Sequence, residues 1–246
     1  VDSDDPFALL ARDASGKVAL NGTTTFPFTL VIPSSVASAS ASSSLNGAPV
    51  VCYGHGFFGD KKELEGAAPR AIMDHAGVVA IAIDWQGMSV DDISTVITDL
   101  GGDVSQTALL GDRVMQAMVN WAATTNAIKA GLFTSDPAFQ RADGSPLVDG
   151  EAPLSYLGIS EGHILGGVMN ALNDDTEHVV LQVGGAGWTT IMFRARPFAS
   201  FLGIMSIAMS DPLARPSTSR RATSRRCTRC AARARRCSAS TCRRTR

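Results

Sequence analysis

Residues 154–167 read LSYLGISEGHILGG, a strand-like run, a sharp turn and a helix-like run in succession. The turn holds the pattern Gly-x-Ser-x-Gly at Gly158, Ser160 and Gly162. A Ser on a tight strand-to-helix turn has its hydroxyl lifted clear of the sheet, and the glycines remove side chains that would clash with neighbouring backbone. The turn also aims the first helical amides at an anion forming beside the Ser. We therefore predict that Ser160 is a nucleophile. The alternative is a Ser that only caps the helix.

Short apolar runs alternate with helix-like stretches around this motif. Residues 108–121 carry apolar side chains at steps of three and four, which predicts a helix packed on a sheet. The sequence therefore predicts an α/β domain over residues 1–214, with a mostly parallel central sheet and helices on both faces. Four continuous apolar runs are the predicted buried strands: 49–53, 78–83, 154–157 and 178–183.

Three further segments complete the predicted domain. Residues 23–32 alternate and are rich in β-formers, which predicts an edge strand that tolerates Pro27. The Ser- and Ala-rich residues 34–44 are predicted to form a surface loop. Residues 133–151 carry two Asp turn signals and are predicted to run over the surface, without the spacing of a calcium loop.

A second motif lies at residues 50–59, which read VVCYGHGFFG. It is an apolar strand that runs into a His-Gly turn, upstream of the Gly-x-Ser-x-Gly turn. The two motifs, their order and the alternation between them resemble the α/β-hydrolase superfamily, in particular bacterial serine esterases and lipases. The resemblance covers residues 26–213 and implies an α/β-hydrolase fold.

The resemblance implies roles for the residues at both turns. Phe57 follows the His-Gly pair and Glu161 follows the nucleophile, and each contributes one backbone amide to an oxyanion hole. His55 shapes its turn and is not the base. Asp84 ends the strand after this turn and is expected to be structural, because the triad acid follows the Ser in chain order. Four residues are candidates either for a substrate pocket or for the core: Phe57, Phe58, Trp85 and Met88.

The acid and the base of a catalytic triad are not identifiable. A Ser hydroxyl needs a His to take its proton and a carboxylate to orient that His. After Ser160 only His163 and His178 remain, and neither is expected to reach the hydroxyl. The fold is therefore expected to be incomplete at its C-terminus, before the strands whose loops would hold the acid and the base. The acidic residues that follow the helix-like run are no clearer candidates. Asp174, Asp175 and Glu177 indicate a solvated loop, and Asp211 stands alone.

Charge divides the chain near residue 214. The sequence holds 22 Lys and Arg against 23 Asp and Glu, but residues 215–246 contain 12 Arg and no acid, so they carry +12 and the rest carries −13. This tail has almost nothing apolar to bury, so it cannot offset the entropy cost of folding. We predict that it is disordered or an out-of-frame reading of GC-rich DNA. Arg-rich runs bind phosphates, but this run lacks Lys and Gly, and no nucleic-acid partner is expected.

The tail also holds four of the five Cys residues, and Cys227 and Cys230 have the C-x-x-C spacing of a zinc or redox site. Ligand spacing without a fold preorganises nothing, so no metal or cofactor is expected. No apolar run approaches the ~20 residues that span a bilayer, and no signal peptide is recognised. We expect a soluble protein. The sequence does not indicate its compartment, and only the resemblance suggests export.

The resemblance implies ester hydrolysis through an acyl-enzyme on Ser160. The expected substrate is a small-molecule or lipid ester, and the expected activity is impaired because the acid and the base are missing. The alternative is a non-catalytic binding protein on a hydrolase scaffold, in which Ser160 only caps a helix.

Overall fold

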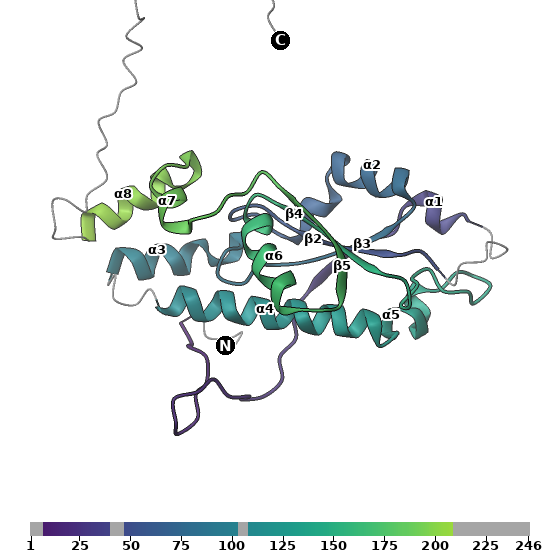
Figure 1. The fold of residues 1–246 in the computed structure, drawn as a ribbon, viewed down its shortest axis with the longest axis horizontal. Helices are drawn as coiled ribbons and strands as arrows, with labels where there is room; N and C mark the ends of the chain where they lie inside the picture. The colour runs from purple at the N-terminus through teal and green to yellow at the C-terminus, as the bar shows by residue number, and fades with distance from the viewer. Residues whose placement is uncertain (1–6, 40–46, 103–107, 209–246) are drawn as a thin grey trace, which may run out of the picture. The chain divides into compact units, whose positions relative to one another are not determined.

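A computed structural model describes part of the chain, shown as a coloured ribbon in Figure 1. The described residues all belong to the first of the two units into which the chain divides, Val1–Arg215. The predicted Arg-rich tail lies outside them, so the domain boundary near residue 214 and the incomplete C-terminus stay predictions. The described ranges are 7–39, 47–102 and 108–208.

A five-stranded sheet forms the centre of the described part, in the order β1-β3-β2-β4-β5. Four strands run parallel, and β1 pairs antiparallel with β3 at one edge. This confirms the predicted α/β class with a mostly parallel sheet, and each predicted strand segment overlaps one observed strand. The prediction that the last of these strands is buried is wrong, because β5 lies at the other edge of the described sheet and its residues after Thr176 are exposed. The strands are β1 (Phe28–Val31), β2 (Val50–Gly54), β3 (Val79–Ile83), β4 (Leu154–Ile159) and β5 (Thr176–Gln182).

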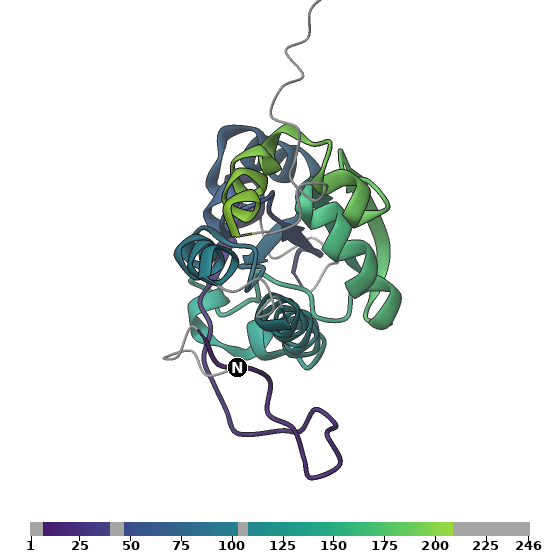
Figure 2. The same ribbon diagram turned by 90° about the vertical axis from the view of Figure 1, so that its left-hand side faces the viewer.

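Helices cover both faces of this sheet, as predicted (Figures 1 and 2). The long helix α4 (Ala108–Lys129) extends past the predicted residue 121 and packs with α6 (Glu161–Leu172) on one face. Helix α2 (Ala67–Ala76) and the 3-10 helix η1 (Lys61–Glu65) cover the other face. Successive residues of β3 therefore point alternately into two cores, which explains its continuous apolar run.

The remaining helices are short, and three of them come after the last strand, β5, in the sequence. Helix α3 (Ile93–Gly102) packs against α8 (Ala199–Ala208). The segment between β5 and α8 contains α7 and a 3-10 helix, whereas α5 and a further 3-10 helix follow α4. Their bounds are α5 (Leu132–Ser135), η4 (Pro137–Phe139), α7 (Trp188–Met192) and η5 (Arg196–Phe198), with η2 (Val90–Asp92) directly before α3.

The predicted loop at residues 34–44 is partly wrong, because it begins with a one-turn helix, α1 (Ser34–Ala37). Asp74 in α2 accepts hydrogen bonds from the Ser35 amide at 3.1 Å and the Ser34 hydroxyl at 3.4 Å. Val36 is buried in the main core, which is the one that contains the buried side chains of α4 and α6. Contacts far apart in the sequence therefore form this helix, and a local pattern does not reveal them. Residues 40–44 lie outside the described residues.

The predicted excursion at residues 133–151 is anchored more firmly than a surface loop. It contains α5 and η4, and Asp136 caps η4 by accepting a hydrogen bond from the Ala138 amide at 2.8 Å. Leu147 and Val148 are buried in the main core, and Val148 bridges to Ala48 beside β2.

Glycines bring three backbone segments together at the start of α6. A Cβ on Gly162 would overlap the carbonyl oxygen of Gly54 in β2, and a Cβ on Gly158 would overlap the carbonyl oxygen of Gly162. The buried phenol of Tyr156 donates a hydrogen bond to that same Gly162 oxygen at 2.7 Å. The Gly-x-Ser-x-Gly pattern therefore has a packing cause at both of its glycines.

We predict that Gly162→Ala lowers the free energy of unfolding by about 1–3 kcal/mol, because the new methyl group overlaps backbone that cannot move away cheaply. Gly111→Ala is the matched control, since Gly111 lies in α4 with no atom within 4 Å of an added Cβ. Helix propensity alone favours Ala at both positions, by up to about 1 kcal/mol. Urea unfolding followed by circular dichroism tests this, and a stabilised Gly162→Ala would contradict the packing account.

Candidate active site

Ser160 lies between β4 and α6 with φ 55° and ψ −106°. Positive φ is uncommon for a residue with a side chain and persists only where the surroundings hold it. The Ser160 amide donates to the carbonyl of Gln182 at 2.9 Å, and its carbonyl accepts from the His163 amide at 3.1 Å. Its side chain makes no capping hydrogen bond to α6. The hydroxyl is therefore not occupied in the way that the cap interpretation requires.

The His-Gly turn lies directly beside Ser160. The Gly162 amide donates to the carbonyl of His55 at 2.9 Å, which joins this turn to the first turn of α6. A Cβ built on Gly56 would lie 3.8 Å from the Cβ of Ser160. The structure thus brings together the two turns that the sequence singled out.

The two amides expected to form an oxyanion hole have no hydrogen-bond partner in the part of the chain that the structure describes. Neither the Phe57 amide nor the Glu161 amide donates a hydrogen bond to any residue in the described ranges. Their neighbours are committed: the Gly56 amide donates to Glu63 at 3.1 Å, and the Gly162 amide donates to His55. Each turn therefore has one amide that is not engaged by another described residue.

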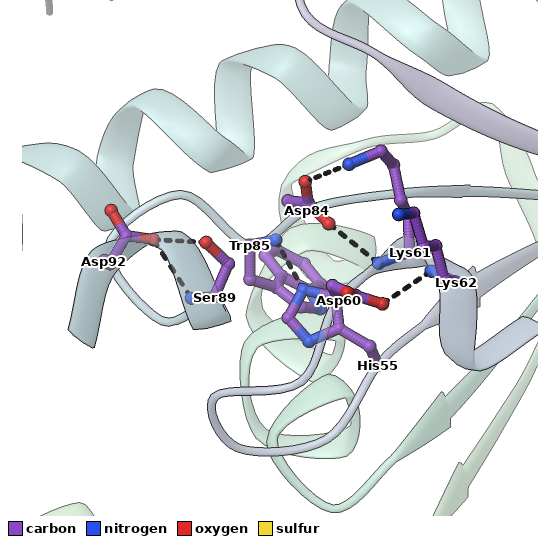
Figure 3. A network of polar contacts seen from close by, with 8 residues as sticks. All are labelled: His55, Asp60, Lys61, Lys62, Asp84, Trp85, Ser89 and Asp92. Atoms are coloured by element: carbon purple, nitrogen blue, oxygen red, sulfur yellow. Dashed lines mark hydrogen bonds and ion pairs between the residues drawn. The ribbon is translucent and has the colours of Figure 1, made fainter.

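His55 is fully buried, and both of its ring nitrogens have partners. Figure 3 shows the contact with Trp85. The Trp85 amide donates to Nε2 at 2.8 Å, so the proton lies on Nδ1, which is 2.8 Å from the Gly56 carbonyl oxygen. The ring thereby joins the His-Gly turn to the residues after β3. In this tautomer His55 has no lone pair left to take a proton from Ser160.

Asp84 fixes η1 to the end of β3 (Figure 3). One carboxylate oxygen accepts from the Lys61 amide at 2.7 Å, and the other pairs with the Lys61 ammonium at 2.6 Å. Asp60 caps the same helix by accepting from the Lys62 amide at 2.8 Å. These contacts give Asp84 a structural position near the His-Gly turn.

The candidates for pocket or core divide into two pairs. Trp85 and Met88 are buried in the main core, whereas Phe57 and Phe58 are half-buried. The centroid of the Phe57 ring lies 4.1 Å from that of Phe198 and 5.6 Å from that of Phe201. The Phe58 ring stacks on Phe201 with their centroids 4.8 Å apart. These four rings form an apolar wall beside the turn. Phe198 and Phe201 were not singled out from the sequence, because nothing local indicates that the chain returns there.

None of the four His residues of the chain is placed as a free base beside Ser160. The Nδ1 atom of His163 accepts a hydrogen bond from the Gly184 amide at 3.2 Å, so its proton lies on Nε2. His178 pairs with Ser155 in the parallel register, five residues before Ser160, which is about 16 Å along a strand. His75 lies in the last turn of α2, which leads into the opposite end of the sheet.

The acidic residues that follow α6 in the chain also lie at the end of the sheet opposite to Ser160. Asp175 accepts a hydrogen bond from the Thr125 hydroxyl at 2.8 Å and lies with Asp174 in the turn before β5. Glu177 was expected in the same loop, but it is an exposed residue of β5 itself. Asp211 lies outside the described residues. The described part therefore offers no acid–base pair for Ser160.

The side chain of Glu161 is the feature that sequence reasoning missed at this site. It is 1% exposed, and its Oε1 atom has no hydrogen-bond partner among the described residues. Burial raises the pKa of Glu161 to about 8. The carboxyl group is thus mostly neutral at pH 7, which keeps a negative charge away from the amide of the same residue.

Two further properties concern the described ranges only. They contain no group of three or more His, Cys, Asp or Glu side chains that could hold a metal ion. No helix in them is long and apolar enough to cross a membrane. Cys227 and Cys230, with their C-x-x-C spacing, lie outside these ranges.

Comparison with known proteins gives structural matches alone, since no family model and no curated protein matches the chain. A cold-adapted esterase from an Arctic intertidal metagenomic library matches at 18% identity and a TM-score of 0.37, over 65% of this chain and 56% of that one. A mutant of the esterase rPPE matches at 17% and 0.38, over 76% and 51%. Acetyl xylan esterase 1 from Thermoanaerobacterium matches at 14% and 0.44, over 77% and 63%. The chain spans half to less than two thirds of these proteins, and no functional assignment rests on them.

We predict that Glu161 makes stability depend on pH. Its folded-state pKa of about 8 lies above the usual 4.5, so the folded protein holds a proton that the unfolded chain releases in this window. The free energy of unfolding therefore falls as pH rises from about 4.5 to 8, by up to about 1.4 kcal/mol per unit. Urea titrations between pH 5 and 9 test this against Glu161→Gln, which should lose this part of the slope. Equal slopes in both proteins would contradict it.

Proposed function

We propose that this protein is a serine hydrolase that acts on carboxylic esters through an acyl-enzyme on Ser160. The observation that carries the proposal is the backbone of Ser160, held at positive φ between β4 and α6 beside the His-Gly turn. The Phe57 and Glu161 amides support it, because each turn leaves one donor that has no acceptor within the described ranges.

In the proposed reaction, the Ser160 hydroxyl oxygen attacks the ester carbonyl carbon while its proton leaves for solvent water, since no base is placed among the described residues. The Phe57 and Glu161 amides hold the negative oxygen of the tetrahedral intermediate. The intermediate collapses as the alcohol leaves with a proton, and the acyl group stays on Ser160. Water then attacks the acyl-enzyme and releases the carboxylic acid, which restores the hydroxyl.

The proton of Ser160 is the weak point of this scheme. His55 and His163 are hydrogen-bonded through the nitrogens described above, and His75 and His178 lie near the other end of the sheet. Without a base and its orienting acid, catalysis is limited to what the oxyanion donors and substrate binding supply. We therefore propose an impaired esterase, with a small-molecule or lipid ester as substrate.

The second candidate function is a non-catalytic binding protein on the same scaffold. The positions of the four His residues favour it, since a binding protein needs no base. The free hydroxyl of Ser160 disfavours it, because the residue does not cap α6 with its side chain.

Covalent labelling separates the two functions. We predict that a fluorophosphonate labels the wild-type protein at Ser160, that Ser160→Ala loses the label and that Ser94→Ala keeps it. Ser94 is an exposed residue of α3 and serves as the matched control. Intact-protein mass spectrometry with peptide mapping measures the result. An unlabelled wild-type protein, or equal labelling of Ser160→Ala, would overturn the proposal in favour of the binding protein.

Turnover tests the impairment on its own. We expect a short p-nitrophenyl ester to be hydrolysed far more slowly than the roughly 1–1000 per second that is typical of enzymes, because no triad assists Ser160. A rate within that range that disappears in Ser160→Ala would show that a base operates outside the scheme described above.

A further inference from the structure

The carboxylate of Glu63 lies on the outer side of the His-Gly turn. Its Oε2 atom accepts a hydrogen bond from the Gly56 amide at 3.1 Å, and Glu63 is half-buried there. A Cβ built on Gly56 would lie 3.6 and 3.8 Å from the two carboxylate oxygens and 3.8 Å from the Cβ of Ser160. Gly56 thus stands between Glu63 and Ser160, and an added Cβ would make ordinary van der Waals contact with both.

Helix η1 holds Glu63 in this place from several sides. Asp60 caps the helix, and Lys61 binds Asp84 through its amide and its ammonium group (Figure 3). Leu64, the next residue, is fully buried in the second core. The carboxylate itself packs so closely on the turn that a Cβ on Gly59 would overlap Oε1. The contacts of η1 therefore hold the Glu63 carboxylate in position to accept the hydrogen bond from the Gly56 amide.

This contact determines which amide of the turn remains free. A hydrogen bond to an ionised acceptor is stronger than one between neutral groups, so it fixes the peptide plane before Gly56. The Gly56 amide is turned toward Glu63, and the next amide, that of Phe57, has no partner among the described residues. The Phe58 amide is committed in turn to the carbonyl of Met88 at 3.1 Å. The Phe57 amide is the one left for a ligand, because the Gly56 and Phe58 amides on either side of it are hydrogen-bonded.

We propose that Glu63 is a positioning residue of the oxyanion hole: by binding the Gly56 amide it aims the Phe57 amide at the oxygen that becomes negative beside Ser160. This proposal rests on the proposed function. Glu63 acts as a hydrogen-bond acceptor and takes no proton from Ser160. Its negative charge opposes an oxyanion nearby, so an uncharged acceptor of the same shape should serve as well or better.

Two substitutions separate the acceptor from the charge. Glu63→Gln keeps an oxygen acceptor for the Gly56 amide and removes the charge, whereas Glu63→Ala removes both. The exposed Glu65, on the same 3-10 helix, provides the control Glu65→Ala. The measured quantities are the maximal rate of Ser160 labelling by a fluorophosphonate, its half-saturating concentration, and the hydrogen exchange of the Gly56 amide by NMR in the full chain.

We expect Glu63→Ala to lower the maximal labelling rate at least tenfold with little change in the half-saturating concentration, and to accelerate Gly56 exchange at least tenfold. Glu63→Gln and Glu65→Ala should label at least a third as fast as wild type and keep Gly56 protected. Wild-type labelling and exchange in Glu63→Ala would overturn the proposal while leaving the proposed function intact. Equal loss of labelling in Glu63→Gln and Glu63→Ala would also overturn it, because the carboxylate would then act chemically. An unlabelled wild type would overturn the proposed function, and with it the role of Glu63.

Discussion

The close approach of the backbone at Gly54, Gly158 and Gly162 constrains the rest of the site. Side chains at these positions would occupy the space of neighbouring backbone or of the Tyr156 phenol, so α6 can start against β2 only if all three are glycines. The chain must then turn within one residue between β4 and α6. Ser160 is that residue, and its positive φ is the consequence. The cost of this strain is offset by the packing of α6 on the sheet and by the buried hydrogen bond from Tyr156 to Gly162.

The second turn depends mainly on polar contacts. His55 joins it to the residues after β3, and Glu63 joins it to η1, whose position is set in turn by Asp84. Most of these groups are buried or half-buried and hydrogen-bonded, which makes their geometry rigid. The direct link between the two turns is the hydrogen bond from the Gly162 amide to His55. The free amides of Phe57 and Glu161 therefore sit on backbone that is fixed before any substrate arrives, as an oxyanion hole requires.

The sequence predicts the sheet and both turns because each leaves a local pattern. Buried strands such as β3 are continuous apolar runs, and the glycines around Ser160 stand at fixed spacing. Features that depend on contacts distant in the chain leave no such pattern. Helix α1 forms against Asp74, and the Phe57 ring meets rings from η5 and α8. The burial of the Glu161 side chain is equally hidden, since a Glu at the start of a helix ordinarily indicates an exposed residue beside the helix dipole.

The geometry of the two turns does not depend on a base, so the proposed oxyanion hole can be tested apart from turnover. The most direct measurement is a crystal structure of the protein after reaction with a fluorophosphonate. We expect phosphorus bonded to the Ser160 oxygen and one phosphoryl oxygen about 2.7–3.1 Å from both the Phe57 and the Glu161 nitrogen. A phosphonate attached elsewhere, or a phosphoryl oxygen that points away from both amides, would contradict it.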